Sequence, residues 1–263
     1  MALFWLKARL VYDRTMKIIT LNIAGRNNFG KNFQERIEAV AAFIDQEEPD
    51  LICFQEAAFS EHENIAEKIN KMLKKPFAFS AAQMCEKYTF DKFSEGFAKK
   101  WQAGQVEHFD DYTNDGLAVL SRTPIVSNST IVLKPVPTDD RGRPDYRVRI
   151  AQILKLDSGF TISNIHLASN NNSHLQLEEL MNYAKTDAIV GDFNMFADNL
   201  YKHADVWKSD YQQSYDFQKY VSFPEENVAL DYMLLKPEYE FVSVRTAENL
   251  SDHAAVVFEL RKK

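Results

Sequence analysis

The chain has 263 residues, of which 45% are hydrophobic and 26% charged, and this composition excludes disordered, collagen-like and coiled-coil proteins. Its formal net charge is −7, which disfavours a protein that grips nucleic acid through a broad basic face, because such affinity comes largely from lysine and arginine. Two cysteines are too few for a disulfide framework, and we expect a cytoplasmic location.

The first residues, 1–15, contain an apolar run that Lys7 and Arg9 interrupt. It is too short for a membrane span of ~20 residues, and no small-residue cleavage site follows it as in a signal peptide. We therefore expect a poorly ordered leader and no transmembrane segment, with an amphipathic surface anchor as the alternative. Residues 16–263 contain no repeat or linker, and we expect them to form one domain.

The first part of the chain alternates predicted strands and helices. Alternating β-branched residues predict a strand over 17–24, and helical spacing of apolar residues predicts a helix over 32–48. A short apolar run predicts a fully buried strand over 50–55. Helical spacing returns over 61–73 and predicts a second helix there.

Short strands dominate the remainder. They are predicted at 116–121, 127–133, 148–156, 160–166, 188–191, 229–235, 240–246 and 254–260, with a helix over 175–184. Many short strands and few helices predict an α/β (α+β) fold with two stacked sheets flanked by helices.

The segment 78–113 fits neither period and carries many aromatic side chains among mixed charges. Long irregular segments in compact domains are often functional, so we expect a substrate-facing insertion or lid. A helical excursion that only covers the core is the alternative.

Several polar residues fall at the C-terminal ends of predicted strands, and two more precede the last predicted strand. They are Asn22, Glu56, His166, Asp192, Asn194, Asp231, Asp252 and His253. Ligand sites form at strand ends in layered folds, so we expect these side chains to converge on one rim.

This residue set suits hydrolysis of a phosphodiester, whose negative charge must be neutralised by a hard cation. Mg²⁺ needs only one or two carboxylates; Glu56 is the best candidate, with Asp252 and Asn22 nearby. Asp192 could accept a proton from water, and Asn194 could orient the phosphate. The sequence has no zinc-type Cys/His cluster, glycine-rich phosphate loop or serine-nucleophile elbow.

Two further groups could act on the phosphate. His253 could be a cation held by Asp231, since a carboxylate partner favours the imidazolium form. Arg147 lies in an arginine-rich run and could clamp phosphate, although the alternating arginines there also fit a solvated strand face.

Seven stretches occur in the order typical of one superfamily. They are LNIAG (21–25), DLICFQEA (50–57), NDGLAVLSR (114–122), SNIHL (163–167), VGDFN (190–194), LDYMLL (230–235) and SDHAAV (251–256). In them the chain resembles the endonuclease/exonuclease/phosphatase superfamily, which includes pancreatic-type DNases, abasic-site endonucleases, neutral sphingomyelinases and inositol-polyphosphate 5-phosphatases.

The resemblance implies a four-layered sandwich of two mainly antiparallel β-sheets flanked by helices. It also implies Mg²⁺ or Mn²⁺ as cofactor, with Glu56 as the direct ligand in a metal site that includes Asn22 and Asp252. The roles it implies for the other residues are activation of water by Asp192, phosphate binding by Asn194, orientation of His253 by Asp231, and phosphate contact by His166. The abasic-site branch lacks a histidine at this last position, so His166 argues against that branch.

The expected function is therefore metal-dependent hydrolysis of a phosphodiester substrate by a monomer. A nuclease-type enzyme acting on nucleic acid is the first expectation, and a phosphoesterase acting on an inositol phosphate or a sphingomyelin-like lipid headgroup is the alternative. A non-catalytic binding module that kept the fold is the remote alternative, which the intact residue set disfavours.

Overall fold

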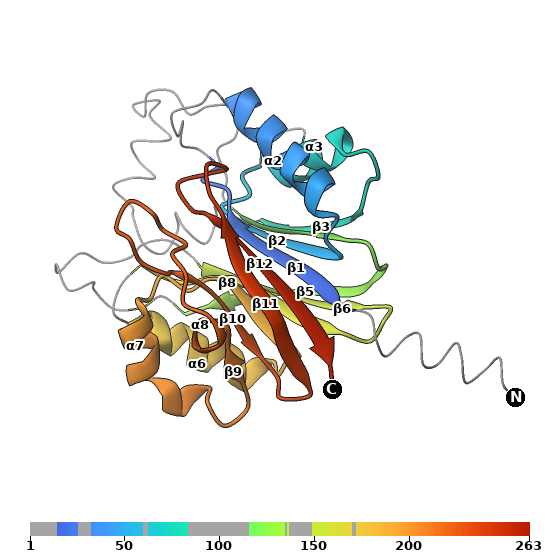
Figure 1. The fold of residues 1–263 in the computed structure, drawn as a ribbon. Coiled ribbons are helices and arrows are strands. Elements are labelled where there is room, and N and C mark those ends of the chain that lie inside the picture. Colours follow the sequence, from blue (N-terminus) through green and yellow to red (C-terminus); the bar gives the residue numbers. More distant parts are fainter. Residues whose placement is uncertain are drawn as a thin grey trace, which may run out of the picture.

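Two six-stranded sheets form the centre of the computed structural model, which describes residues 15–25, 33–59, 63–83, 116–134, 136, 149–169 and 172–263 (Figure 1). The first sheet contains β1 (Met16–Asn22), β2 (Leu51–Gln55), β3 (Ala78–Gln83), β4 (Gly116–Ser121), β11 (Tyr239–Ala247) and β12 (Ala255–Lys262). The second contains β5 (Ile125–Leu133), β6 (Arg149–Leu156), β7 (Thr161–His166), β8 (Ala188–Asp192), β9 (Gln212–Gln213) and β10 (Asp231–Leu235).

Each sheet is mixed and mainly antiparallel. The strand order is β11-β12-β1-β2-β4-β3 in the first sheet and β5-β6-β7-β8-β10-β9 in the second. The pairs β1–β2 and β7–β8 are parallel, and the other ladders are antiparallel. A parallel pair at the middle of each sheet places the carboxyl ends of its two strands at one edge.

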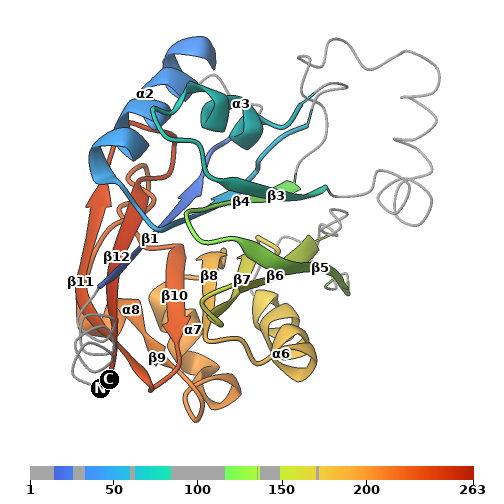
Figure 2. The ribbon, with the colours of Figure 1, turned by 90° about the vertical axis from the view of Figure 1, so that its right-hand side faces the viewer.

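Helices cover the outer face of each sheet (Figure 2). The helices over the first sheet are α2 (Phe33–Glu47) and α3 (Ile65–Met72). Those over the second are α6 (Ser173–Tyr183), α7 (Ala197–Lys202), the 3₁₀ turn η1 (Ala204–Val206) and α8 (Ser214–Phe217). The order helix, sheet, sheet, helix confirms the predicted four-layered sandwich.

The strand β2 shows how the layers are held together. All five of its residues are buried. Leu51 and Cys53 belong to the apolar cluster that fills the space between the sheets and beneath α6, whereas Ile52 and Phe54 belong to the cluster under α2 and α3. Because successive side chains of a strand point to opposite faces, a strand buried on both faces needs a continuous apolar run, as the sequence predicted.

The structure departs from the sequence expectation at residues 78–83. These residues form β3, the edge strand of the first sheet, rather than the beginning of an irregular insertion. An edge strand pairs on one side only, here with β4, and its partly exposed residues carry little apolar alternation. The remainder of the expected insertion, from residue 84 on, and the expected leader up to residue 14 lie outside the described residues.

The structure also contains short elements that periodicity did not predict, namely α7, α8 and β9. Elements of two to six residues complete at most about two helical turns or one strand repeat, so they leave no periodic signal. Among the described helices, none has both the length and the apolar character that a membrane crossing requires.

Candidate active site

Three polar side chains lie side by side on adjacent strands of the second sheet. Asp192, the last residue of β8, pairs with His166, the last residue of parallel β7. On its other side Asp192 pairs with Asp231, the first residue of antiparallel β10. The sequence expectation placed Asp231 at a strand end. It begins a strand instead, and the antiparallel direction of β10 brings that beginning to the end of β8.

The first sheet contributes residues at the same edge. Asn22 ends β1, and Glu56 directly follows the parallel strand β2. The Asn22 side chain donates from Nδ2 to Glu56 Oε1 at 3.2 Å and to Asp192 Oδ2 at 3.0 Å. One amide group therefore joins a carboxylate of the first sheet to a carboxylate of the second.

Local backbone geometry makes this convergence possible. Gly191 has φ of +140°, and a Cβ there would lie 2.1 Å from the carbonyl oxygen of Ile165. Only glycine allows β8 to approach β7 so closely. Glu56 and Asn194 have φ of 50° and 51°, a left-handed conformation that is uncommon for non-glycine residues and concentrates at functional sites.

Asn194 is fixed by two hydrogen bonds. Its backbone N–H donates to Asp192 Oδ1 at 2.8 Å, and its Nδ2 donates to the carbonyl oxygen of Leu167 at 2.9 Å. An amide nitrogen has two N–H groups. The side chain is thus held in place while it retains a second donor for a ligand.

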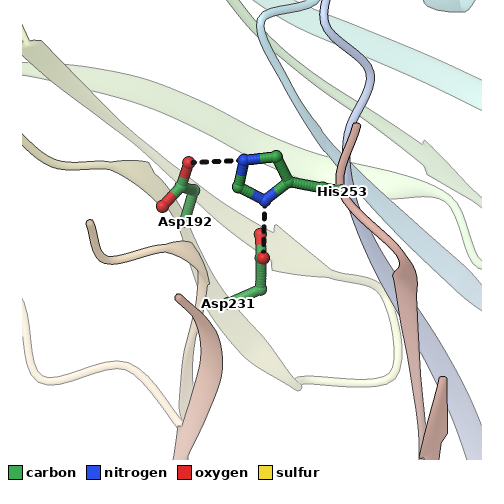
Figure 3. Close-up of side chains that lie close together, drawn as sticks. All are labelled: Asp192, Asp231 and His253. Atoms are coloured by element: carbon green, nitrogen blue, oxygen red, sulfur yellow. Dashed lines mark hydrogen bonds and ion pairs between the residues drawn. The ribbon is translucent and has the colours of Figure 1, made fainter. Parts of the chain in front are cut away.

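His253 lies between two carboxylates (Figure 3). Its Nδ1 is 2.8 Å from Asp231 Oδ2, and its Nε2 is 3.8 Å from Asp192 Oδ2. Burial by itself lowers the pKa of His253, but Asp231, through its charge and hydrogen bond, and Asp192 outweigh burial and raise the pKa to about 10. With this pKa the imidazole is a cation at neutral pH.

Asp192 has the opposite environment. Burial, which is the largest cause, and the charge of Asp231 together raise its pKa to about 7, against the opposing effects of His253, Asn22 and the Asn194 N–H. His166 Nε2 lies 3.5 Å from the same Asp192 Oδ2. The carboxylate at the centre of the site therefore takes up or releases a proton near neutrality.

Two arrangements of ligand atoms are available for a metal ion. Asp192, Asp231 and His253 offer atoms within 4.8 Å of one another. In this group His253 Nδ1 and Asp231 Oδ2 are already bonded to each other. A second pair of oxygen atoms comes from Glu56 and Asp192, which both accept from Asn22 Nδ2.

Oxygen atoms are available for a hard cation at this place. Asn22 Oδ1 accepts from the Ala24 N–H at 3.0 Å, so the amide turns its nitrogen toward the carboxylates, as a hydrogen-bond donor does. The carboxylates of Glu56 and Asp192 offer oxygen atoms, and oxygen donors are what Mg²⁺ prefers.

The other predicted residues have separate positions. Asp252 Oδ1 accepts from Ser251 Oγ at 2.7 Å and from the His253 N–H at 3.0 Å, which closes the turn before β12. Arg147 lies outside the described residues. Arg149, the neighbouring arginine at the start of β6, is 2% exposed, so it does not belong to a solvated strand face.

Sequence patterns did not single out the polar network beneath the site. Gln55 Nε2 donates to Thr20 Oγ1 at 3.0 Å and to Asn164 Oδ1 at 2.8 Å, and Asn164 Nδ2 donates to the carbonyl oxygen of Phe54 at 3.1 Å. All are buried. These three side chains join the two sheets directly below Glu56 and His166. The sequence signal for each of them is a polar residue within an otherwise apolar strand.

Comparison with known proteins gives one family. A family model described as the Endonuclease/Exonuclease/phosphatase family matches residues 19–253. A search among curated proteins found no match.

Solved structures share the fold at low sequence identity. An endonuclease/exonuclease/phosphatase from Beutenbergia cavernae DSM 12333 is 16% identical with a TM-score of 0.66, covering 95% of this chain and 72% of that one. The human nocturnin catalytic domain, solved with a bound sulfate anion, is 20% identical with a TM-score of 0.63, covering 95% and 94%. TDP2 from D. rerio, complexed with a single strand DNA product, is 12% identical with a TM-score of 0.64, covering 95% and 100%.

Proposed function

Because the chain belongs to the endonuclease/exonuclease/phosphatase family, whose members are phosphoester hydrolases, we propose that it is a divalent-metal-dependent phosphodiesterase that directs water onto phosphorus in line with the leaving group. The convergence of His166, Asn22 and His253 on the single carboxylate Asp192 carries the proposal. These donors surround one buried acid at the edge of two sheets.

In this proposal Glu56 is the direct ligand of Mg²⁺ or Mn²⁺, Asp252 supports the metal side by its charge, and Asn22 orients Glu56 against Asp192. A metal bound there would neutralise the phosphate and stabilise the charge that develops on it. Asn22 is thus a positioning residue, because its nitrogen faces the carboxylates.

The chain's own groups divide the remaining work. Asp192 accepts the proton of the attacking water, and a pKa of about 7 suits a general base at neutral pH. His253, held as a cation by Asp231, stabilises the developing negative charge. His166 and the second N–H of the Asn194 amide bind phosphoryl oxygens.

The proposed substrate class is nucleic acid, with a small or lipid-linked phosphate headgroup as the second candidate. TDP2 from D. rerio was solved with a single strand DNA product, which favours the first. The net charge of −7 favours the second, because a small headgroup needs no extended basic surface.

An assay panel tests the proposal. Single- and double-stranded DNA, RNA, inositol phosphates, sphingomyelin and a generic phosphodiester reporter are each incubated with Mg²⁺, Mn²⁺ or EDTA. We expect cleavage that EDTA abolishes, and a loss of about 10²–10⁴-fold in kcat for Asp192→Asn, the range for removal of a general base.

Asp187→Asn is the matched control. Asp187 precedes β8 at the opposite end from Asp192, where its Oδ2 accepts from the N–H and hydroxyl of Thr161. Asp187→Asn makes the same change of charge just before the same strand, away from the site. The enzymatic assignment would be wrong if the protein cleaves no substrate in the panel and Asp192→Asn behaves as wild type does on the reporter.

A further inference from the structure

Arg36 is a charged residue inside the core. It lies on α2 and is 2% exposed. On the helix it occupies the same face as the apolar residues Ile37 and Val40, which are also buried. A guanidinium taken out of water is costly unless anions and hydrogen-bond acceptors surround it, so its position requires specific partners. A cation within an apolar helical stripe is the sequence signal that marks it.

Hydrogen bonds connect Arg36 to the carboxylates of Glu56 and Asp192 in three steps. Arg36 Nη1 donates to the carbonyl oxygen of Ala24 at 2.8 Å. The Ala24 N–H, in a residue with φ of 46°, donates to Asn22 Oδ1 at 3.0 Å. Asn22 Nδ2 then donates to Glu56 and Asp192. The guanidinium thus holds the turn that orients the amide between the two carboxylates.

The same turn is packed tightly against the end of β2. A Cβ on Gly25 would lie 2.3 Å from the backbone oxygen of Glu56 and 2.8 Å from Cβ of Ala58. The turn therefore cannot move toward β2 without displacing the backbone that presents Glu56. With Arg36 on one side and Glu56 on the other, the position of Asn22 is determined from both directions.

Arg36 also acts by charge. Burial lowers its pKa, whereas the charges of Asp252 and Glu56 raise it. These two carboxylates are the ones assigned above to the metal side of the site. The guanidinium therefore neutralises the same anions that a divalent cation would neutralise.

We propose that Arg36 is a positioning residue of the metal site, a fixed internal cation that holds the Asn22 turn and partly neutralises Glu56 and Asp252 before a divalent ion binds. This inference rests on the proposed function in requiring a metal beside Glu56. Because Arg36 and the metal share their anions, their effects on the folded state are coupled. Removing the charge of Arg36 makes the fold depend more strongly on the metal.

The experiment measures thermal unfolding and calorimetric Mg²⁺ binding of the full chain, without substrate. Arg36→Gln keeps an N–H donor but removes the charge, and Arg36→Lys keeps the charge. In EDTA we expect Arg36→Gln to melt below wild type. Mg²⁺ should then raise its Tm by more than that of wild type and bind about 5- to 150-fold more tightly, the usual range of coupling between two sites. Arg36→Lys should respond to Mg²⁺ as wild type does.

Arg122→Gln is the matched control for loss of one arginine. Arg122 also donates to a backbone carbonyl, that of Lys75, and lies over an aromatic ring, that of Phe77. Its backbone N–H donates to the carbonyl oxygen of Asp50. Asp50 directly precedes β2, whereas Glu56 directly follows it, so Arg122 lies at the end of β2 away from the site. We expect its Mg²⁺ response to equal that of wild type.

The outcomes separate the two proposals. A wild-type protein that neither Mg²⁺ nor Mn²⁺ binds or stabilises overturns the proposed function and this inference together. Wild-type metal binding with an unchanged Mg²⁺ response in Arg36→Gln overturns the role of Arg36 alone. If Arg36→Gln does not fold even with Mg²⁺, the Mg²⁺ affinity of Arg36→Lys becomes the test of the charge role. An affinity of Arg36→Lys equal to that of wild type supports the charge role, and an altered affinity contradicts it.

Discussion

Asn22 donates a hydrogen bond to Asp192 across 170 residues of sequence, from the last residue of β1 in one sheet to the last residue of β8 in the other. The same amide nitrogen donates to Glu56. Two carboxylates that would otherwise repel each other therefore share one neutral donor, and the two sheets are joined at the active edge.

Replacing this amide by an isosteric acid tests that arrangement. Asn22→Asp places a third carboxylate against Glu56 and Asp192, and we expect the free energy of unfolding in EDTA at pH 7 to fall by about 3–5 kcal/mol, the cost of an uncompensated buried charge. Asn22→Ala, which removes the donor without adding charge, should lose about 1–3 kcal/mol. Urea denaturation measures both, and equal losses for the two variants would contradict electrostatic repulsion as the cause.

The charge of His253 depends on Asp231. In Asp231→Asn the charge and hydrogen bond of Asp231 are gone, while burial and the charges of Asp192 and Asp252 remain, so the pKa of His253 should fall from about 10. NMR titration of the imidazole gives this value directly. The imidazole is then less firmly held as a cation, and we expect kcat on the generic reporter to fall by about 10²–10⁴-fold. An unchanged pKa of His253 in this variant would disprove the dependence.

Gly191 should tolerate no side chain. Gly191→Ala brings a Cβ to 2.1 Å from the Ile165 carbonyl oxygen and must push β8 away from β7. We expect a loss of stability above about 3 kcal/mol, as for severe overpacking combined with backbone strain. Gly159→Ala is the control, because Gly159 also has positive φ, +87°, but a Cβ added there would meet nothing within 4 Å. It should lose only about 1–2 kcal/mol, and equal losses would assign the effect at Gly191 to backbone conformation alone.

The buried carboxylate of Asp192 should cost stability in the metal-free protein. Its folded-state pKa of about 7 lies above its ordinary value of 3.8. Between these values the folded protein holds a proton that the unfolded chain has released, so stability falls as pH rises from about 4 to 7.

Asp192→Asn removes this cost. In EDTA we expect it to unfold at the same denaturant concentration as wild type near pH 4 and to be more stable by about 1–4 kcal/mol at pH 8, at about 1.4 kcal/mol per pKa unit. Denaturant midpoints measured across this range provide the test. A variant that is less stable than wild type at pH 8 would show that ionised Asp192 is already compensated without metal.

Local pattern was sufficient for the layered fold. The continuous apolar run of β2 predicts burial on both faces, and the polar residues at the ends of β1, β2, β7 and β8 predict that their side chains meet at one edge, because parallel strands end together. The order of the matching stretches predicted the family that the family comparison confirms.

Only tertiary structure decided how the site is held and charged. Periodicity reports whether a residue is buried, but it does not report which distant residue it faces. The pairing of Asp231 with Asp192, the orientation of the Asn22 amide and the contact of Arg36 with the turn at Ala24 are such long-range relations. The protonation of His253 follows from them, since a pKa depends on burial and on the charges that the fold brings within a few ångströms.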